Sequence, residues 1–248
     1  MAETPLLETR GLKKYFATSR GTLHAVDDVN LVIGHSQTLG VVGESGCGKS
    51  TLGKTIMRLT EPTAGQILFH GQDIAILPKK EMRELRRSIQ MVFQDPYSSL
   101  DPRMSVSQLI EDPMVVYGIP RAERLKRVRE LMDIVGLAQR SASSYPHELD
   151  GGRRQRIGIA RTLSLDPEFI VCDEPVSALD VSIQAQILNL LMDLQEERKL
   201  TYLFITHDLS VVRHISNEIM VCLLYTSQGG PSRNDLFIAI KQNSRRIS

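Results

Sequence analysis

Residues 43–50 read Gly-Glu-Ser-Gly-Cys-Gly-Lys-Ser and follow the apolar run 38–42, Thr-Leu-Gly-Val-Val. Glycines at this spacing let successive backbone amides turn inward around a polyphosphate. The lysine adds a point charge for the terminal phosphates, and the next hydroxyl is placed to bind Mg²⁺. A chance glycine-rich turn is the alternative, but this motif lies between a predicted strand and a predicted helix, as it requires. The stretch therefore predicts a nucleoside triphosphate site made by Gly43, Glu44, Ser45, Gly46, Cys47, Gly48, Lys49, Ser50 and Thr51.

The composition is that of an ordinary globular chain with balanced charge. Its 248 residues are 42% hydrophobic, enough for one sizeable core, and the formal net charge of +1 gives no electrostatic reason to expect nucleic acid. The apolar run 219–225 has the length of a strand, well short of a membrane helix. Residues 1–11 lack a signal-peptide pattern, and the three cysteines have no paired spacing. We therefore expect a reducing, cytosolic setting.

Short apolar segments alternate with helical patterns, which favours a mainly parallel sheet covered by helices. Segments 22–33 and 66–70 are rich in β-branched and aromatic residues and predict a small antiparallel layer near the N-terminus. The fold class is therefore α/β, and with the phosphate-binding motif it resembles a P-loop NTPase (RecA-like) core. The predicted core strands are 39–42, 89–93, 169–172, 202–206 and 219–224.

The stretch from about 95 to 161 carries helical patterns and no strand signal. In 121–135, apolar residues recur on one face until Gly136 ends the pattern, and a second strong helix is predicted from Val181 to about Glu197. We interpret 95–161 as a helical subdomain inserted into a single domain that spans 1–248.

Two carboxylates follow the apolar strand 169–172. Asp173 comes first, where a carboxylate can hold a water of the Mg²⁺ shell, and Glu174, one residue on, can orient or deprotonate an attacking water. The alternative is a strand that simply reaches solvent at an acidic turn. The preceding phosphate-binding motif favours the metal and catalytic interpretation.

Gln94 and His207 each follow a predicted strand, at the carboxyl end where open α/β sheets bind ligands. Gln94 could contact both metal and water, or be a plain polar strand end. His207, taken alone, is more often a packed or solvated histidine than a catalytic one. A third segment, Leu149-Asp150-Gly151-Gly152-Arg153, opens a predicted helix and could bind an anion at its start.

Six ordered motifs carry a resemblance to the ATP-binding-cassette ATPases, and they span about residues 6–222. They are similar to that family's Walker A, Q-loop, signature, Walker B, D-loop and switch histidine. Residues 43–51, 93–104 and 177–186 resemble the ATP-binding subunits of oligopeptide and dipeptide importers in particular. The matching residues are 43–51, Gln94, Leu149–Arg153, Asp173-Glu174, Ser177–Asp180 and His207.

The resemblance implies roles for these residues. Glu174 would be the general base and His207 would steady the γ-phosphate; Ser50, Gln94 and Asp173 would hold Mg²⁺. Tyr15 would stack on adenine, although Phe16 could serve instead, because any aromatic face suits a base. The remaining residues that the resemblance assigns to ATP binding, across the partner's site, are Asp150, Gly151, Gly152, Arg153 and Asp180.

The resemblance also implies partners. Two ATPase subunits would face each other head to tail, and integral membrane permeases would dock near Gln94 and the helical insertion. The chain would then lie at the cytoplasmic face of the membrane and serve, indirectly, an extracytoplasmic solute-binding protein. The transported solute is not encoded in this subunit. A soluble cassette ATPase acting on nucleic acid or ribosomes is the alternative, but such proteins usually carry coiled-coil insertions, zinc modules or a second cassette.

The sequence departs from the family pattern in two places. The usual signature Leu-Ser-Gly-Gly-Gln is Leu-Asp-Gly-Gly-Arg here, so Asp150 would present a negative charge to the partner's γ-phosphate. This predicts a hetero-dimer with a paralogue, in which one ATP site is efficient and the other weak. Residues from about 223 to 248 lack the family's glycine-containing hairpin and are interpreted as an atypical tail.

Overall fold

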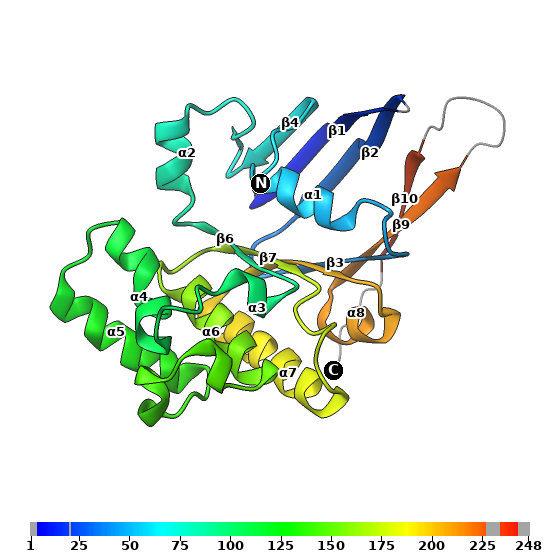
Figure 1. Cartoon of the computed structure of the whole chain (residues 1–248). Coiled ribbons are helices and arrows are strands. Elements are labelled where there is room, and N and C mark those ends of the chain that lie inside the picture. The colour runs from blue at the N-terminus through cyan, green and yellow to red at the C-terminus, as the bar shows by residue number, and fades with distance from the viewer. Residues whose placement is uncertain (1–3, 20, 227–233, 243–248) are drawn as a thin grey trace.

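The chain folds into two β-sheets with helices packed around them (Figure 1). The computed structural model describes residues 4–19, 21–226 and 234–242. A six-stranded sheet of order β10-β9-β3-β8-β7-β6 forms the centre, and a four-stranded sheet of order β2-β1-β4-β5 lies above it in the view of Figure 1. The predicted α/β class, with a mainly parallel sheet and an antiparallel N-terminal layer, is confirmed.

Five neighbouring strands of the central sheet run parallel. Their register pairs Val42 with Thr206 and Asp173 with Ile205, so three of them end side by side. The loops that follow therefore open on one edge of the sheet, where α/β proteins bind ligands. The five strands are β3 (Thr38–Gly43), β6 (Ile89–Val92), β7 (Phe169–Asp173), β8 (Thr201–Thr206) and β9 (Glu218–Thr226).

The antiparallel layer contains one long strand that the sequence analysis does not predict. Segments 22–33 and 66–70 are strands as expected, but the strand that pairs with both is 7–18. Its pairing register shifts after Thr9, Leu12 and Lys14, and Gly11 has a φ of 55°, so its apolar residues do not alternate regularly. The strands are β1 (Leu7–Thr18), β2 (Gly21–Ile33), β4 (Ala64–Phe69) and β5 (Gln72–Asp73).

Helix α1 (Lys49–Ile56), which follows the phosphate-binding motif, packs within the core shared by the two sheets. Its Leu52 and Ile56 are each 1% exposed, in one cluster with Val26 of β2 and Val171 of β7. Burial of each such side chain contributes about 1.5–3 kcal/mol. The helix that begins at Lys49 is therefore fixed from both sides, and its first residues reach the carboxyl edge of the central sheet.

The predicted helical insertion follows β6 and lies below the central sheet in Figure 1. Helix α4 has a capping box in which Ser105 accepts from Gln108, and Gly136, with a φ of 67°, follows the end of α5. Val106 and Met132, both fully buried, pack in the core that joins this subdomain to the sheet. The elements are α3 (Pro96–Ser99), α4 (Val106–Val116), α5 (Arg121–Ile134), η1 (Gln139–Ser143), η2 (Pro146–Glu148) and α6 (Gly151–Leu163).

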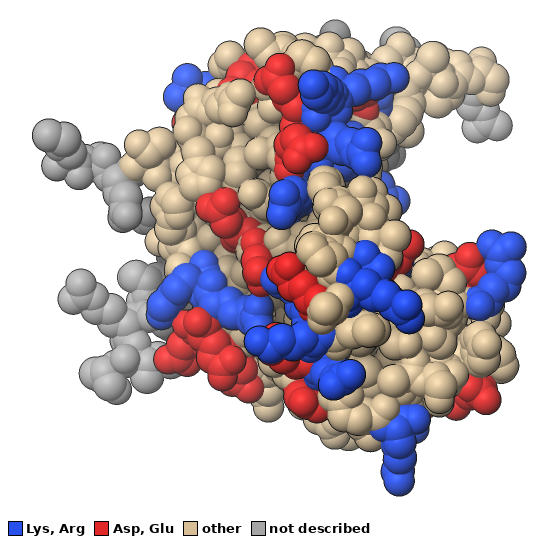
Figure 2. All heavy atoms as spheres, turned by 90° about the vertical axis from the view of Figure 1, so that its left-hand side faces the viewer, with Lys and Arg blue, Asp and Glu red and all other residues tan. Residues whose placement is uncertain are grey.

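Helix α5 is rich in basic residues, but its charges are partly paired with acidic ones. The Arg124 Nε lies 2.7 Å from Glu111, the Lys126 ammonium lies 3.7 Å from Glu130, and Arg127 forms an ion pair with Asp166. Figure 2, which views the side carrying α2 and the helical subdomain, shows positive and negative side chains interspersed. Such balanced charge is typical of a solvated helix face.

Three further helices and a last strand complete the described chain. Strand β10 pairs antiparallel with β9 from Asn234↔Thr226 to Gln242↔Glu218, although the sequence analysis predicts no strand beyond 224. Its few apolar residues follow a Gly-Gly-Pro stretch and give a weak signal on their own. Residues 227–233 and 243–248 of the atypical tail lie outside the described residues. The elements are α2 (Lys79–Leu85), α7 (Val181–Arg198), α8 (Leu209–Ile215) and β10 (Asn234–Gln242).

Candidate nucleotide site

A cavity of about 670 Å³ opens at the carboxyl edge of the central sheet. Its volume lies in the range of small-molecule sites. The structure brings together there most of the residues that the sequence analysis selected, from β3, β6, β7, β8 and α1. The lining residues are Phe16, Leu23, His24, Ala25, 45–51, Gln94, Glu174, Ser177, Ala178 and His207.

The phosphate-binding loop requires glycine where it meets the N-terminal end of α1. Gly48 occupies the N-cap position with a φ of 99°, and a Cβ there would lie 2.1 Å from the Ala25 carbonyl oxygen. Any other residue at this position would bring its Cβ against the backbone of β2. It would also have to adopt a positive φ, which residues with a side chain resist. The absence of a side chain therefore lets the loop pack against β2 while its amides remain near the cavity.

Lys49 is the buried cation of the loop, only 4% exposed. Its Nζ donates to the carbonyl oxygens of Gly43 at 2.8 Å and Glu44 at 2.7 Å. Main-chain carbonyls satisfy the ammonium donors but carry no net charge. The positive charge therefore remains available to attract a phosphate that enters the cavity.

Ser50 and Asp173 meet beside Lys49. The Ser50 hydroxyl donates to Asp173 Oδ1 at 2.7 Å, across 123 residues of sequence. Asp173 is 3% exposed, and burial raises the pKa of its carboxyl, although the hydrogen bond from Ser50 acts in the opposite direction.

These groups are hard oxygen ligands of the kind that Mg²⁺ prefers. Among the described residues, no group of three or more His, Cys, Asp and Glu side chains could hold a metal ion. Because Mg²⁺ is commonly held by one or two carboxylates together with substrate phosphates, the Ser50–Asp173 pair fits it as part of a nucleotide complex.

Glu174 accepts two hydrogen bonds at the cavity wall, from Gln94 Nε2 at 3.1 Å and, through a ring nitrogen at 3.2 Å, from His207. Its φ of 47° is unusual for a residue other than glycine, and its backbone amide donates to the Ile205 carbonyl oxygen at 2.9 Å. Strained backbone of this kind persists only where the surroundings hold it, and it is enriched at functional sites. Gln94 and His207 therefore both contact one carboxylate oxygen of Glu174, Oε2, and fix its orientation at the cavity wall.

The structure separates the two aromatic candidates for adenine stacking. Phe16 lines the cavity, whereas Tyr15 does not. The Tyr15 ring stacks on His24 with centroids 3.9 Å apart, and its hydroxyl donates to Asp27 Oδ1 at 2.5 Å. These contacts engage Tyr15 outside the cavity lining and leave the Phe16 ring at the cavity. Of the alternatives given by the sequence, the geometry favours Phe16.

The predicted signature residues and Asp180 lie away from this cavity. Asp150 is the N-cap of α6: its side chain accepts from the Arg153 amide at 2.8 Å and lies 3.3 Å from the Arg153 Nε. A Cβ on Gly152 would lie 2.6 Å from Ile183 Cγ2, so the start of α6 packs closely against α7, for which Asp180 is the N-cap. These residues form a second, exposed surface of the chain.

The structure contains a groove of about 660 Å³ whose lining residues the sequence analysis does not name. It lies between the core and the helical subdomain, and it is lined by the end of α1, by β6 and by α4. The sequence feature that could have indicated this groove is the pair of apolar residues Val115 and Val116 at the end of α4. The two residues are 50% and 54% exposed. The lining includes Met57, Leu59, Arg86, Gln90, Phe93, Asp112, Val116, Tyr117 and Arg161.

Comparison with known proteins agrees with this geometry. Residues 26–177 match the family model described as ABC transporter. The oligopeptide transport ATP-binding protein OppF of Bacillus subtilis is 54% identical over 219 residues, which cover 87% of this chain and 72% of that protein. A putative peptide import ATP-binding protein of Brucella ovis is 50% identical over 238 residues, covering 96% and 75%.

A solved structure is also similar over most of the chain. The ATP-binding cassette MJ0796, in its dimeric, post-hydrolysis state bound to ADP and Pi, has a TM-score of 0.79 and 31% sequence identity, covering 87% of this chain and 93% of that one. Within the described residues, no helix is long and apolar enough to cross a membrane.

Proposed function

We propose, from the premise that this chain belongs to the ATP-binding-cassette transporter family, that it hydrolyses ATP to drive the import of oligopeptides or dipeptides. The observation that carries the proposal is the convergence of Lys49, Ser50, Asp173 and Glu174 on one cavity at the carboxyl edge of the sheet. The peptide substrate is supported by the names of the relatives in Bacillus and Brucella. The alternative, a soluble cassette acting on nucleic acid, is not favoured, because those relatives are transport proteins.

The chemistry follows from the positions of the side chains. Lys49 and the loop amides bind the phosphates, and Phe16 packs on the base. Bound Mg²⁺, held beside Ser50 and Asp173, supplies charge neutralisation for the phosphates. Glu174 takes the proton of the attacking water, while the hydrogen bonds from Gln94 and His207 fix the orientation of its carboxylate.

The exposed start of α6 supports a composite site shared by two subunits. Asp150 and Arg153 are exposed and do not line the chain's own cavity, so the start of α6 is available to a nucleotide held by another cassette. MJ0796 is a dimeric cassette in the similar structure. We therefore place a second ATPase subunit, a paralogue, against this surface in a head-to-tail arrangement.

The groove between the core and the helical subdomain supports docking of a membrane permease. Its lining combines the apolar side chains of Met57, Phe93 and Val116 with the charged ones of Arg86 and Asp112. Such a groove suits an amphipathic helix, which places apolar residues inside and charged ones at the edge. Phe93 precedes Gln94, so a helix bound here would lie next to a side chain that contacts Glu174. The chain would thus be held at the inner face of the membrane by its permeases.

Co-purification with permease subunits tests this function. We expect integral membrane permeases to accompany the wild-type chain from detergent extracts, and a peptide-loaded binding protein to stimulate ATP hydrolysis after reconstitution in nanodiscs. Val116→Asp, inside the groove, should reduce co-purification at least about tenfold, because a buried charge without a partner is costly.

Val115→Asp is the matched control, because Val115 is equally exposed on the same helix but does not line the groove. If both variants retain the permeases as well as the wild type does, the groove is not the docking site. Stimulation of ATP hydrolysis by RNA or DNA instead of peptide would support the soluble alternative.

A further inference from the structure

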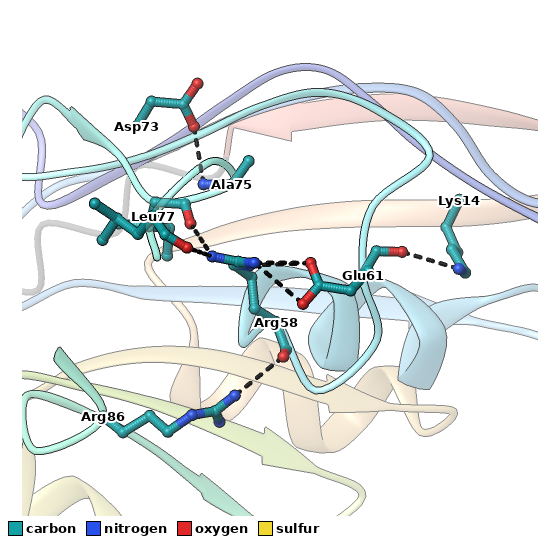
Figure 3. A network of polar contacts seen from close by, with 8 residues as sticks. Lys14, Arg58, Glu61, Asp73, Ala75, Leu77 and Arg86 are labelled. Atoms are coloured by element: carbon teal, nitrogen blue, oxygen red, sulfur yellow. Dashed lines mark hydrogen bonds and ion pairs between the residues drawn. The ribbon is translucent and has the colours of Figure 1, made fainter. Parts of the chain in front are cut away.

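The C-terminal end of α1 is held by one arginine. Arg58 follows the helix with a φ of 49°, a left-handed conformation that costs free energy for a residue with a side chain. Its Nη1 donates to the carbonyl oxygens of Ile74 at 2.9 Å and Leu77 at 2.7 Å, so one guanidinium fixes the turn that precedes α2 (Figure 3). The Arg58 side chain is only 10% exposed.

The same guanidinium is paired with Glu61. The Arg58 Nη2 lies 2.9 Å from one carboxylate oxygen and 3.1 Å from the other, and Nε lies 3.2 Å from the first, so the pair is bidentate. The Glu61 carbonyl oxygen accepts from Lys14 Nζ at 2.8 Å, which ties this segment to β1. Strand β1 also carries Phe16, so the network reaches the cavity wall from a second side.

Arg86 connects this network to the groove. Its Nη2 donates to the Arg58 carbonyl oxygen at 3.1 Å, as Figure 3 shows, and its own carbonyl oxygen accepts from Gln90 of β6 at 2.5 Å. Arg86 lines the groove together with Met57 and Leu59, the two residues that flank Arg58. The end of α1 is therefore part of the groove wall, while the Arg58 guanidinium is bonded to the turn that precedes α2.

Helix α1 joins these contacts to the nucleotide cavity. It is 8 residues long, with Lys49 and Ser50 at its first turn. At about 1.5 Å per residue the helix spans about 12 Å, and its backbone hydrogen bonds connect its two ends. A displacement of its C-terminal end therefore moves its N-terminal end as well.

We propose that Arg58 is a positioning residue that, together with Arg86, couples the groove to the phosphate-binding loop through helix α1. The groove as a permease site rests on the function proposed above. The coupling itself is a property of this chain, because both arginines and the helix belong to it. A partner that moves Arg86 would alter the position of Lys49, and nucleotide would in turn alter the groove.

The test uses the full chain without any partner. Arg58→Lys keeps the charge and the apolar stem but cannot form the fork, Glu61→Gln removes the charged acceptor, and Arg86→Gln shortens the link to α1. We expect each to weaken the binding of a fluorescent ATP analogue about three- to tenfold, measured well below the melting temperature of every variant. Hydrogen exchange of the amides 49–52 should rise roughly tenfold.

Two variants serve as matched controls. Arg103→Lys removes a guanidinium fork from Asp101 on an exposed loop, and Val115→Ser alters an exposed position of α4 that does not line the groove. Both should bind the analogue as the wild type does. The proposal is overturned if the Arg58 and Arg86 variants bind the analogue within about twofold of the wild type and raise amide hydrogen exchange only within 58–77. That result would show a purely structural role, because such a role acts locally.

The nucleotide-binding test of the coupling and the co-purification test of permease docking can fail independently. If Val116→Asp releases the permeases while the Arg58 variants bind nucleotide normally, docking stands and the coupling fails. If the Arg58 variants lose affinity and no permease binds to the groove, the coupling stands and its proposed partner is wrong.

Discussion

The chain carries two surfaces that we propose to contact ATP, the phosphate-loop cavity and the start of α6, and their side chains are held in different ways. In the phosphate-loop cavity, Lys49 and Asp173 are 4% and 3% exposed, and Ser50 contacts Asp173 across 123 residues of sequence. At the start of α6, the side chains of Asp150 and Arg153 are 61% and 57% exposed, and they bond to each other three residues apart. One surface is organised by long-range contacts and the other by its own first helical turn.

This difference shows which surface can act alone. The cavity groups are held by several strands, so their positions do not depend on a partner. At the start of α6, the exposed Asp150 and Arg153 side chains bond to each other, so their proposed effect on ATP depends on what a second subunit presents to them. The following predictions test that contrast, from the largest expected effect to the smallest.

Loss of the Glu174 carboxylate should have the largest effect. In Glu174→Gln, turnover of the assembled transporter should fall about 10²–10⁴-fold, because the water loses its base, while ATP affinity should stay within about twofold. Steady-state hydrolysis and equilibrium binding measure the two quantities. Glu168→Gln, a change at an exposed carboxylate that contacts His70, is the control. Hydrolysis at the wild-type rate in Glu174→Gln would show that the cavity works by another base.

Loss of the buried Lys49 cation should weaken binding itself. In Lys49→Ala, affinity for ATP should fall about 10–100-fold, because charge-assisted hydrogen bonds to phosphate are removed from a desolvated site. Isothermal titration with MgATP measures this. Lys54→Ala, on an exposed position of the same helix, should bind within about twofold of the wild type. Equal affinity of both variants would mean that the cavity does not depend on its buried charge.

Asp150 tests the outward surface. Two like charges about 4 Å apart at an effective dielectric near 20 repel by about 4 kcal/mol, and the Arg153 pair offsets part of this. Asp150→Ser and Asp150→Asn keep an N-cap acceptor and remove the charge. Turnover of the assembled transporter, or nucleotide trapping at the partner's site, should rise about three- to tenfold in both.

A third variant at Asp150 separates the effect of the charge from that of helix capping. Asp150→Ala removes both and should lower the stability of the subunit by about 1 kcal/mol, as measured by urea unfolding. If Ser and Asn leave both turnover and trapping unchanged, Asp150 does not face a phosphate, and the predicted inequality of the two ATP sites is wrong.

A pair of glycines in α6 gives the smallest effect. A Cβ on Gly152 would lie 2.6 Å from Ile183 Cγ2, whereas a Cβ on Gly158 would meet nothing within 4 Å. Gly152→Ala should destabilise the subunit by about 1 kcal/mol through overpacking, and Gly158→Ala should stabilise it by about 0.5–1 kcal/mol through helix propensity. Urea midpoints compare them. Equal shifts would show that α6 and α7 are not closely packed at this surface.

The sequence by itself determined the residues whose function depends on a fixed local spacing. The phosphate-binding loop, the adjacent Asp173 and Glu174, and the parallel core strands each follow from a short pattern of residues. The sequence also predicted Gln94 and His207 at the carboxyl ends of strands, the edge where ligands bind, and in the structure both contact Glu174 there. Strands β1 and β10 were missed because irregular alternation and weak apolar content hide a strand from such patterns.

Tertiary structure decided the features that need contacts between distant segments. Only the pairing of β1 with β2 shows that Phe16 rather than Tyr15 lines the cavity, because it places the Tyr15 ring on His24 and its hydroxyl on Asp27. Only the approach of α2 to the end of α1 places Arg86 against the Arg58 carbonyl oxygen, 28 residues away. Local sequence sets the conformation of each segment, whereas packing of the shared core sets which segments meet, and the groove and its link to the ATP site arise at that second step.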